Sequence, residues 1–230
     1  MRYCLLLGLT LMGSVWAQEV PQRNMVQFDA VASREVANDL AQASLFVELS
    51  DADPSRLADK VNQALAAALK MTKQYPAVQL GASTYNTYPL YSHKSNKQEG
   101  WRSRGELRVS SKDFAALSKL IAELQSGKGL ALQLAEVRYA VSEEQRRTVE
   151  DALIEEGLTA FQRRAALIQK GMAAKSWRLV NVNVSTSGAR PEPRPMMMKA
   201  AMMDAAAPAP IEGGESRMQV NISGSIQLAE

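Results

Sequence analysis

Apolar and polar residues alternate at several places along the chain, which is typical of a strand with one buried face. The alternation is clearest from Val26 to Ala32, where every second residue is apolar, and from Met218 to Leu228 near the end of the chain. Further strands are predicted at Leu45 to Leu49, Val78 to Ala82, Trp101 to Ser110, Leu132 to Val141 and Trp177 to Thr186.

Three segments between these strands have helical spacing instead. Asp53 followed by Pro54 is a helix start, and leucines and valines then recur every four residues as far as about Lys73. Ser111 begins a second helix that ends near Gly127. Ser142 with Gln145 three residues later forms a capping box, so a third, long helix is expected from there to about Ala174.

The order of these elements is ββαββαβαββ. Strands in pairs that alternate with helices are typical of the α+β class, with antiparallel sheets and helices packed on one face. The two halves of the chain are candidates for two similar layers of sheet and helix, although no residue-level repeat relates them.

The N-terminus has the pattern of an export signal. Arg2 supplies a positive charge, Leu5 to Val15 is apolar, and cleavage is expected after Ala17, at small side chains. An uncleaved anchor is the alternative, but the apolar run is shorter than the ~20 residues that span a bilayer. We therefore expect a signal peptide at 1–17 and a single α+β domain at 18–230, with no transmembrane segment, in the periplasm or secreted.

Composition excludes several functional classes. The 27 basic and 24 acidic residues give a net charge of +3, which does not favour nucleic acid. The chain has one His and one Cys, and the cysteine, Cys4, leaves with the signal peptide. The chain therefore has too few His and Cys residues for the usual zinc sites or catalytic triads. We therefore predict no catalytic residue, no cofactor and no enzyme activity.

One segment, 187–216, has low complexity and is rich in Pro, Met and Ala. It is expected to form a long loop or an arm that docks on another subunit. Clustered thioethers also suit Cu(I) or can act as an oxidant sink, and these two alternatives stay open. The methionines concerned are Met196, Met197, Met198, Met202 and Met203.

Aromatic side chains gather around one predicted hairpin, at Tyr85, Tyr88, Tyr91 and Trp101. Aromatic residues with polar groups are favoured at interfaces, so these four are a candidate surface for a ligand or partner. The alternative is that they cover the end of the sheet or fill a subunit contact.

The layout resembles the SIMPL-domain family, which includes oxidative-stress-defence and periplasmic immunogenic proteins. The resemblance covers about Val26 to Leu228 and rests on four features in order. They are the strand pair before the Leu57–Leu69 helix, Tyr88-Pro89-Leu90-Tyr91 with Gly100-Trp101-Arg102, the long helix before Trp177-Arg178-Leu179-Val180, and Glu212-Gly213-Gly214-Glu215 before the last strand.

This resemblance implies a periplasmic protein that associates with itself and supports envelope or oxidative-stress tolerance. It supplies no catalytic residue. We therefore expect a non-enzymatic homo-oligomer, with possible association with the envelope. A Met-rich module that binds copper or scavenges oxidants is the alternative.

Overall fold

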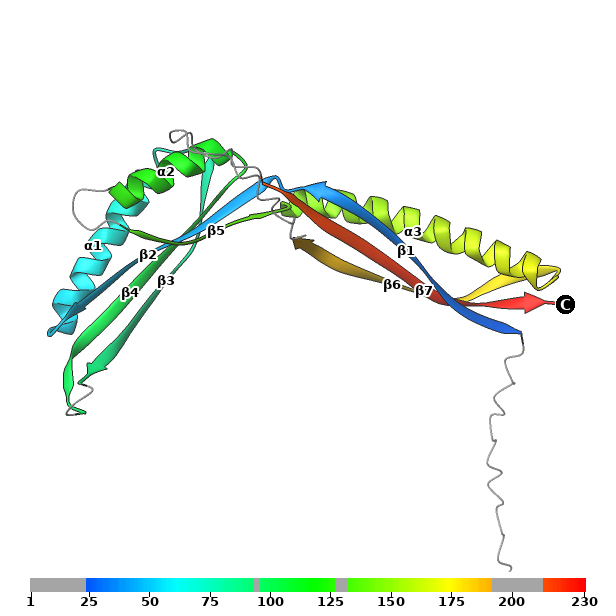
Figure 1. Ribbon diagram of the computed structural model, residues 1–230, viewed down its shortest axis with the longest axis horizontal. Coiled ribbons are helices and arrows are strands. Elements are labelled where there is room, and N and C mark those ends of the chain that lie inside the picture. The colour runs from blue at the N-terminus through cyan, green and yellow to red at the C-terminus, as the bar shows by residue number, and fades with distance from the viewer. Residues whose placement is uncertain (1–23, 93–95, 127–131, 192–212) are drawn as a thin grey trace, which may run out of the picture.

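The computed structural model describes residues 24–92, 96–126, 132–191 and 213–230 (Figure 1). The helices are α1 (Pro54–Thr72), α2 (Phe114–Ser126) and α3 (Glu143–Gly171). The strands are β1 (Met25–Ala37), β2 (Leu40–Asp51), β3 (Val78–Tyr91), β4 (Gln98–Ser111), β5 (Gln133–Ala140), β6 (Ser176–Pro191) and β7 (Glu215–Ala229). The predicted α+β class and the order ββαββαβαββ are confirmed.

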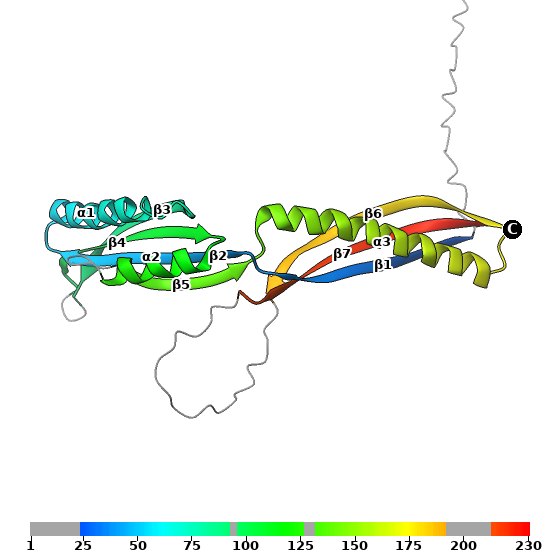
Figure 2. The ribbon, with the colours of Figure 1, turned by 90° about the horizontal axis from the view of Figure 1, so that it is seen from above.

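The described strands form two antiparallel sheets, one of order β1-β7-β6 and one of order β3-β4-β2-β5. Helix α3 packs on the first sheet, and α1 and α2 pack on the second. We call these units the α3 lobe and the α1/α2 lobe. They follow one another along the long axis of an elongated molecule (Figures 1 and 2).

The lobes do not correspond to the two halves of the chain. Strand β1 pairs with β7 over its whole length, from Met25 opposite Gln227 to Ala37 opposite Glu215. The α1/α2 lobe is therefore inserted between the first strand of the α3 lobe and the rest of it. The expected division into two halves is wrong because the pairing of the first and last strands leaves no trace in local periodicity.

The core of the α3 lobe lies between α3 and the inner face of β1 and β7. The rings of Phe28 and Phe161 stack with centroids 4.3 Å apart, and Ile222 is fully buried. A Cβ atom on Gly157 would lie 2.8 Å from Cγ1 of Ile222, so α3 passes close to the sheet at this glycine. Burial of large apolar side chains along this seam is the main stabilising contribution in this lobe.

The α1/α2 lobe has a core of its own. Leu45 of β2, Leu107 of β4 and Leu120 of α2 are fully buried, and Leu57 and Val61 anchor α1 on the same sheet. The predicted helix start at Asp53 is confirmed, because its carboxylate accepts hydrogen bonds from the backbone N–H groups of Ser55 and Arg56.

Asp51 fastens the end of β2 to the first turns of α1. Its carboxylate accepts hydrogen bonds from Lys60 (2.9 Å), the backbone N–H of Asp53 (3.0 Å) and Arg56 (3.0 Å). These hydrogen bonds hold the pKa of Asp51 well below its ordinary value, and the bond from Lys60 has the largest effect. Burial opposes them, but its effect is smaller.

We expect this arrangement to make acid unfolding depend on Asp51. Because its pKa is lowered on folding, Asp51 stabilises the fold above the unfolded pKa of about 4, and this stabilisation is lost as the pH falls further. In Asp51→Asn, the melting temperature should fall less between pH 4 and pH 2 than in the wild type. Asp59→Asn is the matched control, since Asp59 makes no side-chain hydrogen bond or ion pair among the described residues. An unchanged pH profile in Asp51→Asn would contradict the prediction.

The lobes meet at Asn38, which links β1 to β2 and is 9% exposed. Its backbone N–H donates to the carbonyl of Gly214 (3.0 Å) and its Nδ2 to the carbonyl of Gly213 (2.7 Å). Its Oδ1 accepts a hydrogen bond from Ser216 (2.7 Å). A Cβ atom on Gly213 would lie 2.9 Å from the Asn38 carbonyl and from the ring of Phe114, so only glycine fits here without movement.

Asp39 makes a second connection at the same place. Its carboxylate accepts hydrogen bonds from the backbone N–H and the hydroxyl of Ser142, the N-cap of α3, and lies 3.4 Å from Nζ of Lys112. Burial raises the pKa of Asp39, but the bonds from Ser142 and Lys112 outweigh it and bring the pKa below its ordinary value. A charged carboxylate thus holds the start of α3 against the β1–β2 connection.

Candidate functional site

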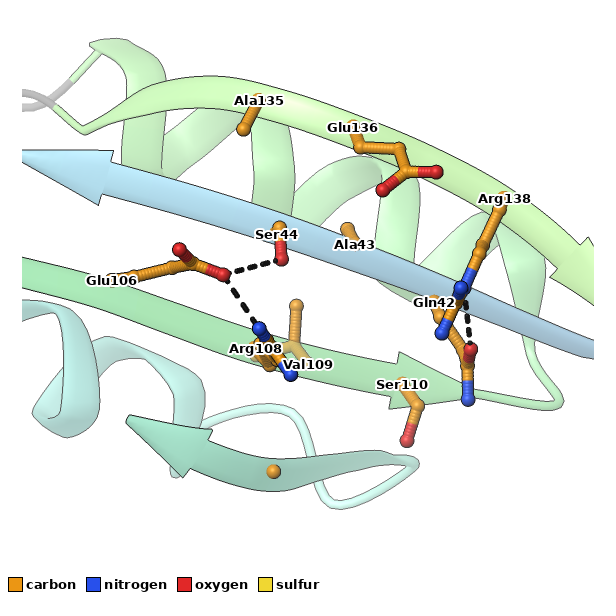
Figure 3. Close-up of a pocket in the computed structure, with 11 residues that line it drawn as sticks. Gln42, Ala43, Ser44, Glu106, Arg108, Val109, Ser110, Ala135, Glu136 and Arg138 are labelled. Carbon is orange, nitrogen blue, oxygen red and sulfur yellow. Dashed lines mark hydrogen bonds and ion pairs between the residues drawn. The ribbon is translucent and has the colours of Figure 1, made fainter. Parts of the chain in front are cut away.

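A polar groove lies on the sheet face of the α1/α2 lobe that points away from its helices (Figure 3). It has a volume of about 560 Å³. Alternate side chains of three adjacent strands form it, because successive residues of a strand point to opposite faces. Those that carry its polar groups are Gln42 and Ser44 of β2, Glu106, Arg108 and Ser110 of β4, and Glu136 and Arg138 of β5.

Glu106 lies in the floor of the groove. Its carboxylate accepts a hydrogen bond from the hydroxyl of Ser44 (3.0 Å) and one from Nε of Arg108 (3.1 Å), as Figure 3 shows. The bond from Arg108, followed by that from Ser44, lowers the pKa of Glu106 although burial opposes the effect. Glu106 is therefore a fixed negative charge near neutral pH and a weak base.

Strand β5 supplies the opposite wall. Nε of Arg138 donates to the side-chain carbonyl of Gln42 (2.9 Å), which orients the guanidinium across the groove. Glu136 makes no side-chain hydrogen bond or ion pair among the described residues. The groove thus presents guanidinium N–H groups beside carboxylates, a surface that suits a ligand or peptide carrying both charges.

The charged state of Glu106 limits the chemistry that the groove can perform. Ser44 donates its proton to a carboxylate whose pKa is lowered, so the pair has little tendency to activate the hydroxyl as a nucleophile. Its charges are instead arranged for binding by hydrogen bonds and ion pairs.

The charged face continues along β4 beyond the groove. The guanidinium of Arg104 lies 3.7 Å from the ring centroid of Phe46, and Glu48 lies 3.8 Å from both Arg102 and Arg104. Sequence reasoning missed this face and the groove. The available signal was the run of charges at every second position from Arg102 to Arg108, which places them on one side of a strand.

The structure separates the four aromatic candidates of the predicted hairpin. Tyr85 pairs with Gly105 on the helix side of the sheet, whereas Tyr88 pairs with Arg102 on the groove side. Tyr85 and Tyr88 are each 41% exposed and Tyr91 is 56% exposed. Trp101 is half-buried and packs against the cluster of Val47, Leu57 and Val61 under α1. The tyrosines thus remain available to a partner, while Trp101 contributes to the core.

The methionine tract lies outside the described residues, so Met196, Met197, Met198, Met202 and Met203 have no structural account here. Among the residues that are described, no group of three or more His, Cys, Asp and Glu side chains is placed to hold a metal ion. None of the described helices is both long enough and apolar enough to cross a bilayer.

Comparison with known proteins identifies a family. The model of the SIMPL family, described as a protein of unknown function (DUF541), matches residues 26–226. No curated protein matches the chain. The matched range includes both lobes and all ten elements except the ends of β1 and β7. The resemblance inferred from the sequence is thereby confirmed, and the chain belongs to the SIMPL family.

Proposed function

We propose that the mature protein is a non-enzymatic homo-oligomer that acts in the periplasm or outside the cell and supports envelope or oxidative-stress tolerance. The observation that carries this proposal is the incomplete coverage of both sheets. Apolar side chains remain exposed on the outermost strands of each lobe, where a monomeric protein normally has charges, prolines or a covering segment.

Exposed apolar side chains occur on all three of the strands β3, β5 and β6. Leu80 is 43% exposed, Leu134 and Val137 are 37% exposed, and Leu179 is 50% exposed. On β6 the exposed apolar residues follow one another along the strand, so they form a strip rather than isolated positions. They are Leu179, Val180, Val182 and Val184. Burying such strips against a second subunit would gain roughly 25 cal/mol for each Å² of apolar surface removed from water.

Export and the role in stress tolerance have separate support. The charged start, short apolar run and small residues of positions 1–17 favour a cleaved signal peptide. A mature chain without cysteine is insensitive to thiol oxidation, which suits an oxidising compartment. The stress role rests on the resemblance to SIMPL proteins that act in oxidative-stress defence.

The mass in solution tests the assembly. For the chain from Gln18 to Glu230, we expect light scattering after size exclusion to give the mass of two or more chains at micromolar concentration. A strain that lacks the protein should also be more sensitive to peroxide or detergent, and the exported protein should restore tolerance. A concentration-independent monomer together with unchanged sensitivity would overturn the proposal.

A further inference from the structure

Strand β6 carries a strip of apolar side chains, Leu179, Val182 and Val184, that α3 leaves partly exposed. Leu179 and Val184 lie opposite Ile226 and Ile222 of β7, so they point to the helix side of the sheet. Ile222 and Ile226 are fully buried, yet Leu179 is 50% exposed, and Val182 and Val184 are 40% exposed. Helix α3 follows β1 and β7, and β6 lies at the other edge of the sheet (Figure 1). The inner face of β6 is therefore apolar and only partly covered by the described residues.

The opposite edge of the same sheet carries more charges, although Val31 on it is also 50% exposed. Strand β1 carries charged, exposed side chains at Asp29, Arg34 and Glu35. Helix α3 adds an ion pair from Glu156 to Arg34 and a hydrogen bond from Arg164 to the backbone carbonyl of Asp29. Charges and covering side chains are the usual means by which an edge strand is kept from pairing with another chain.

The middle of strand β6, from Leu179 to Ser187, lacks such charges. No charged residue and no proline occurs from Leu179 to Ser187, and β-branched valines alternate with Asn and Ser. From Asn181 to Ser187 the register with β7 is uninterrupted. The side chain of Asn181 accepts bonds from the backbone N–H and the hydroxyl of Ser225, which holds the start of this stretch in place. The result is a regular, uncharged edge of the kind that accepts a further strand.

We propose that a second copy of this chain adds to this edge through its own β6, antiparallel and related by a twofold axis at Asn183. This inference rests on the proposed homo-oligomer and specifies one of its interfaces. Residues that face each other in an antiparallel pair point to the same side of the sheet, so a twofold axis must pass through a residue position. With the axis at Asn183, Val182 of each copy faces Val184 of the other copy on the inner side of the sheet.

The remaining pairs in this register are compatible as well. Asn181 faces the partner's Ser185 on the outer side, and Asn183 faces its own copy. No like charges are brought together, which is the electrostatic condition for an isologous pair. Two three-stranded sheets would thus join into one of six strands, with both copies of α3 on the same face.

The inner strip would be buried by this arrangement. The Glu156–Arg34 ion pair marks the flank of α3 that faces β1. Leu158 is two residues further on, about 200° around the helix, and so lies on the flank toward β6. It is partly buried against the core of the lobe. In the pair, Leu158, Val182 and Val184 of both copies would line one shared apolar seam.

Disulfide trapping tests the interface directly, because the mature chain has no cysteine. Facing residues have Cα atoms about 4.5–5.5 Å apart, within the ~4.4–6.8 Å range of disulfides. We expect Asn183→Cys to form a covalent dimer under mild oxidation. Ser187→Cys is the matched control, since its two copies would lie roughly 26 Å apart along the strands. Ser33→Cys on β1 controls for chance collision.

The outcomes separate the interface from the proposed function. Selective trapping at Asn183, together with a lower oligomer mass in Val182→Glu, supports the β6 pair. A mass that shows an oligomer without trapping at Asn183, or equal trapping at all three positions, overturns the β6 pair and leaves the homo-oligomer standing. A monomeric mass overturns both.

Discussion

Gly224→Ala is expected to destabilise the protein strongly, although it adds only one methyl group. A Cβ atom at this position would lie 2.4 Å from the backbone carbonyl of Asn181, 3.1 Å from the ring of Phe161 and 3.2 Å from Cα of Val182. The first contact is with backbone and cannot be relieved by a side-chain rotation. We expect a loss of about 3 kcal/mol in the free energy of unfolding, the upper part of the usual range for overpacking.

Thermal unfolding at one fixed protein concentration measures this effect. For a chain of this length, a loss of about 3 kcal/mol lowers the melting temperature by roughly 6–12 °C. Gly171→Ala is the matched control, because a Cβ atom there meets nothing within 4 Å and alanine is the better helix former. It should raise stability by up to about 1 kcal/mol. Equal melting temperatures for Gly224→Ala and the wild type would show that β6 and β7 do not approach this closely.

Strand β6 illustrates what a local sequence pattern cannot predict. The sequence from Trp177 to Thr186 predicts a strand, and the strand is confirmed. Its leucine and valines are nevertheless 40–50% exposed, because α3 follows the β1 side of the sheet. Periodicity reports which side chains share a face, whereas the position of the helix decides whether that face is covered.

Local chemistry predicted two of the three helix starts. The helix starts at Asp53 and Ser142 are confirmed, because each rests on a side-chain oxygen that accepts bonds from neighbouring N–H groups. Ser111 is instead the last residue of β4, and α2 begins at Phe114 after Asp113, whose carboxylate accepts a hydrogen bond from the backbone N–H of Ala116. Strand ends were less visible. Strand β2 begins at Leu40 rather than near Leu45, since Ala41 and Ala43 are buried but too small to stand out as a hydrophobic alternation.

The candidate site could be anticipated only in part. Charges at alternate positions of β4 place Glu106 and Arg108 on one face of a strand. The groove also needs Glu136 and Arg138, which come from β5 on the far side of β2. Strand order in a sheet depends on packing between distant segments, so no local pattern brings these residues together.

Asn38→Ala is expected to weaken the connection between the lobes. The asparagine side chain both donates to the carbonyl of Gly213 and accepts from the hydroxyl of Ser216, at 2.7 Å each. Alanine would leave both groups without this partner at a position that is 9% exposed. Each unsatisfied buried group costs about 1–3 kcal/mol, so we expect a loss of about 2–4 kcal/mol in the free energy of unfolding.

Denaturant unfolding of Asn38→Ala beside Asn86→Ala separates the junction from a general effect of losing an amide. Asn86 is exposed on β3, and its replacement should change stability by less than about 0.5 kcal/mol. If Asn38→Ala lost as little free energy of unfolding as Asn86→Ala, water would replace the lost hydrogen bonds and the junction would be accessible to solvent. The expected larger loss has a structural cause, because β1, β2 and the segment before β7 meet at this residue. Asn38 therefore holds both lobes in one relation to each other.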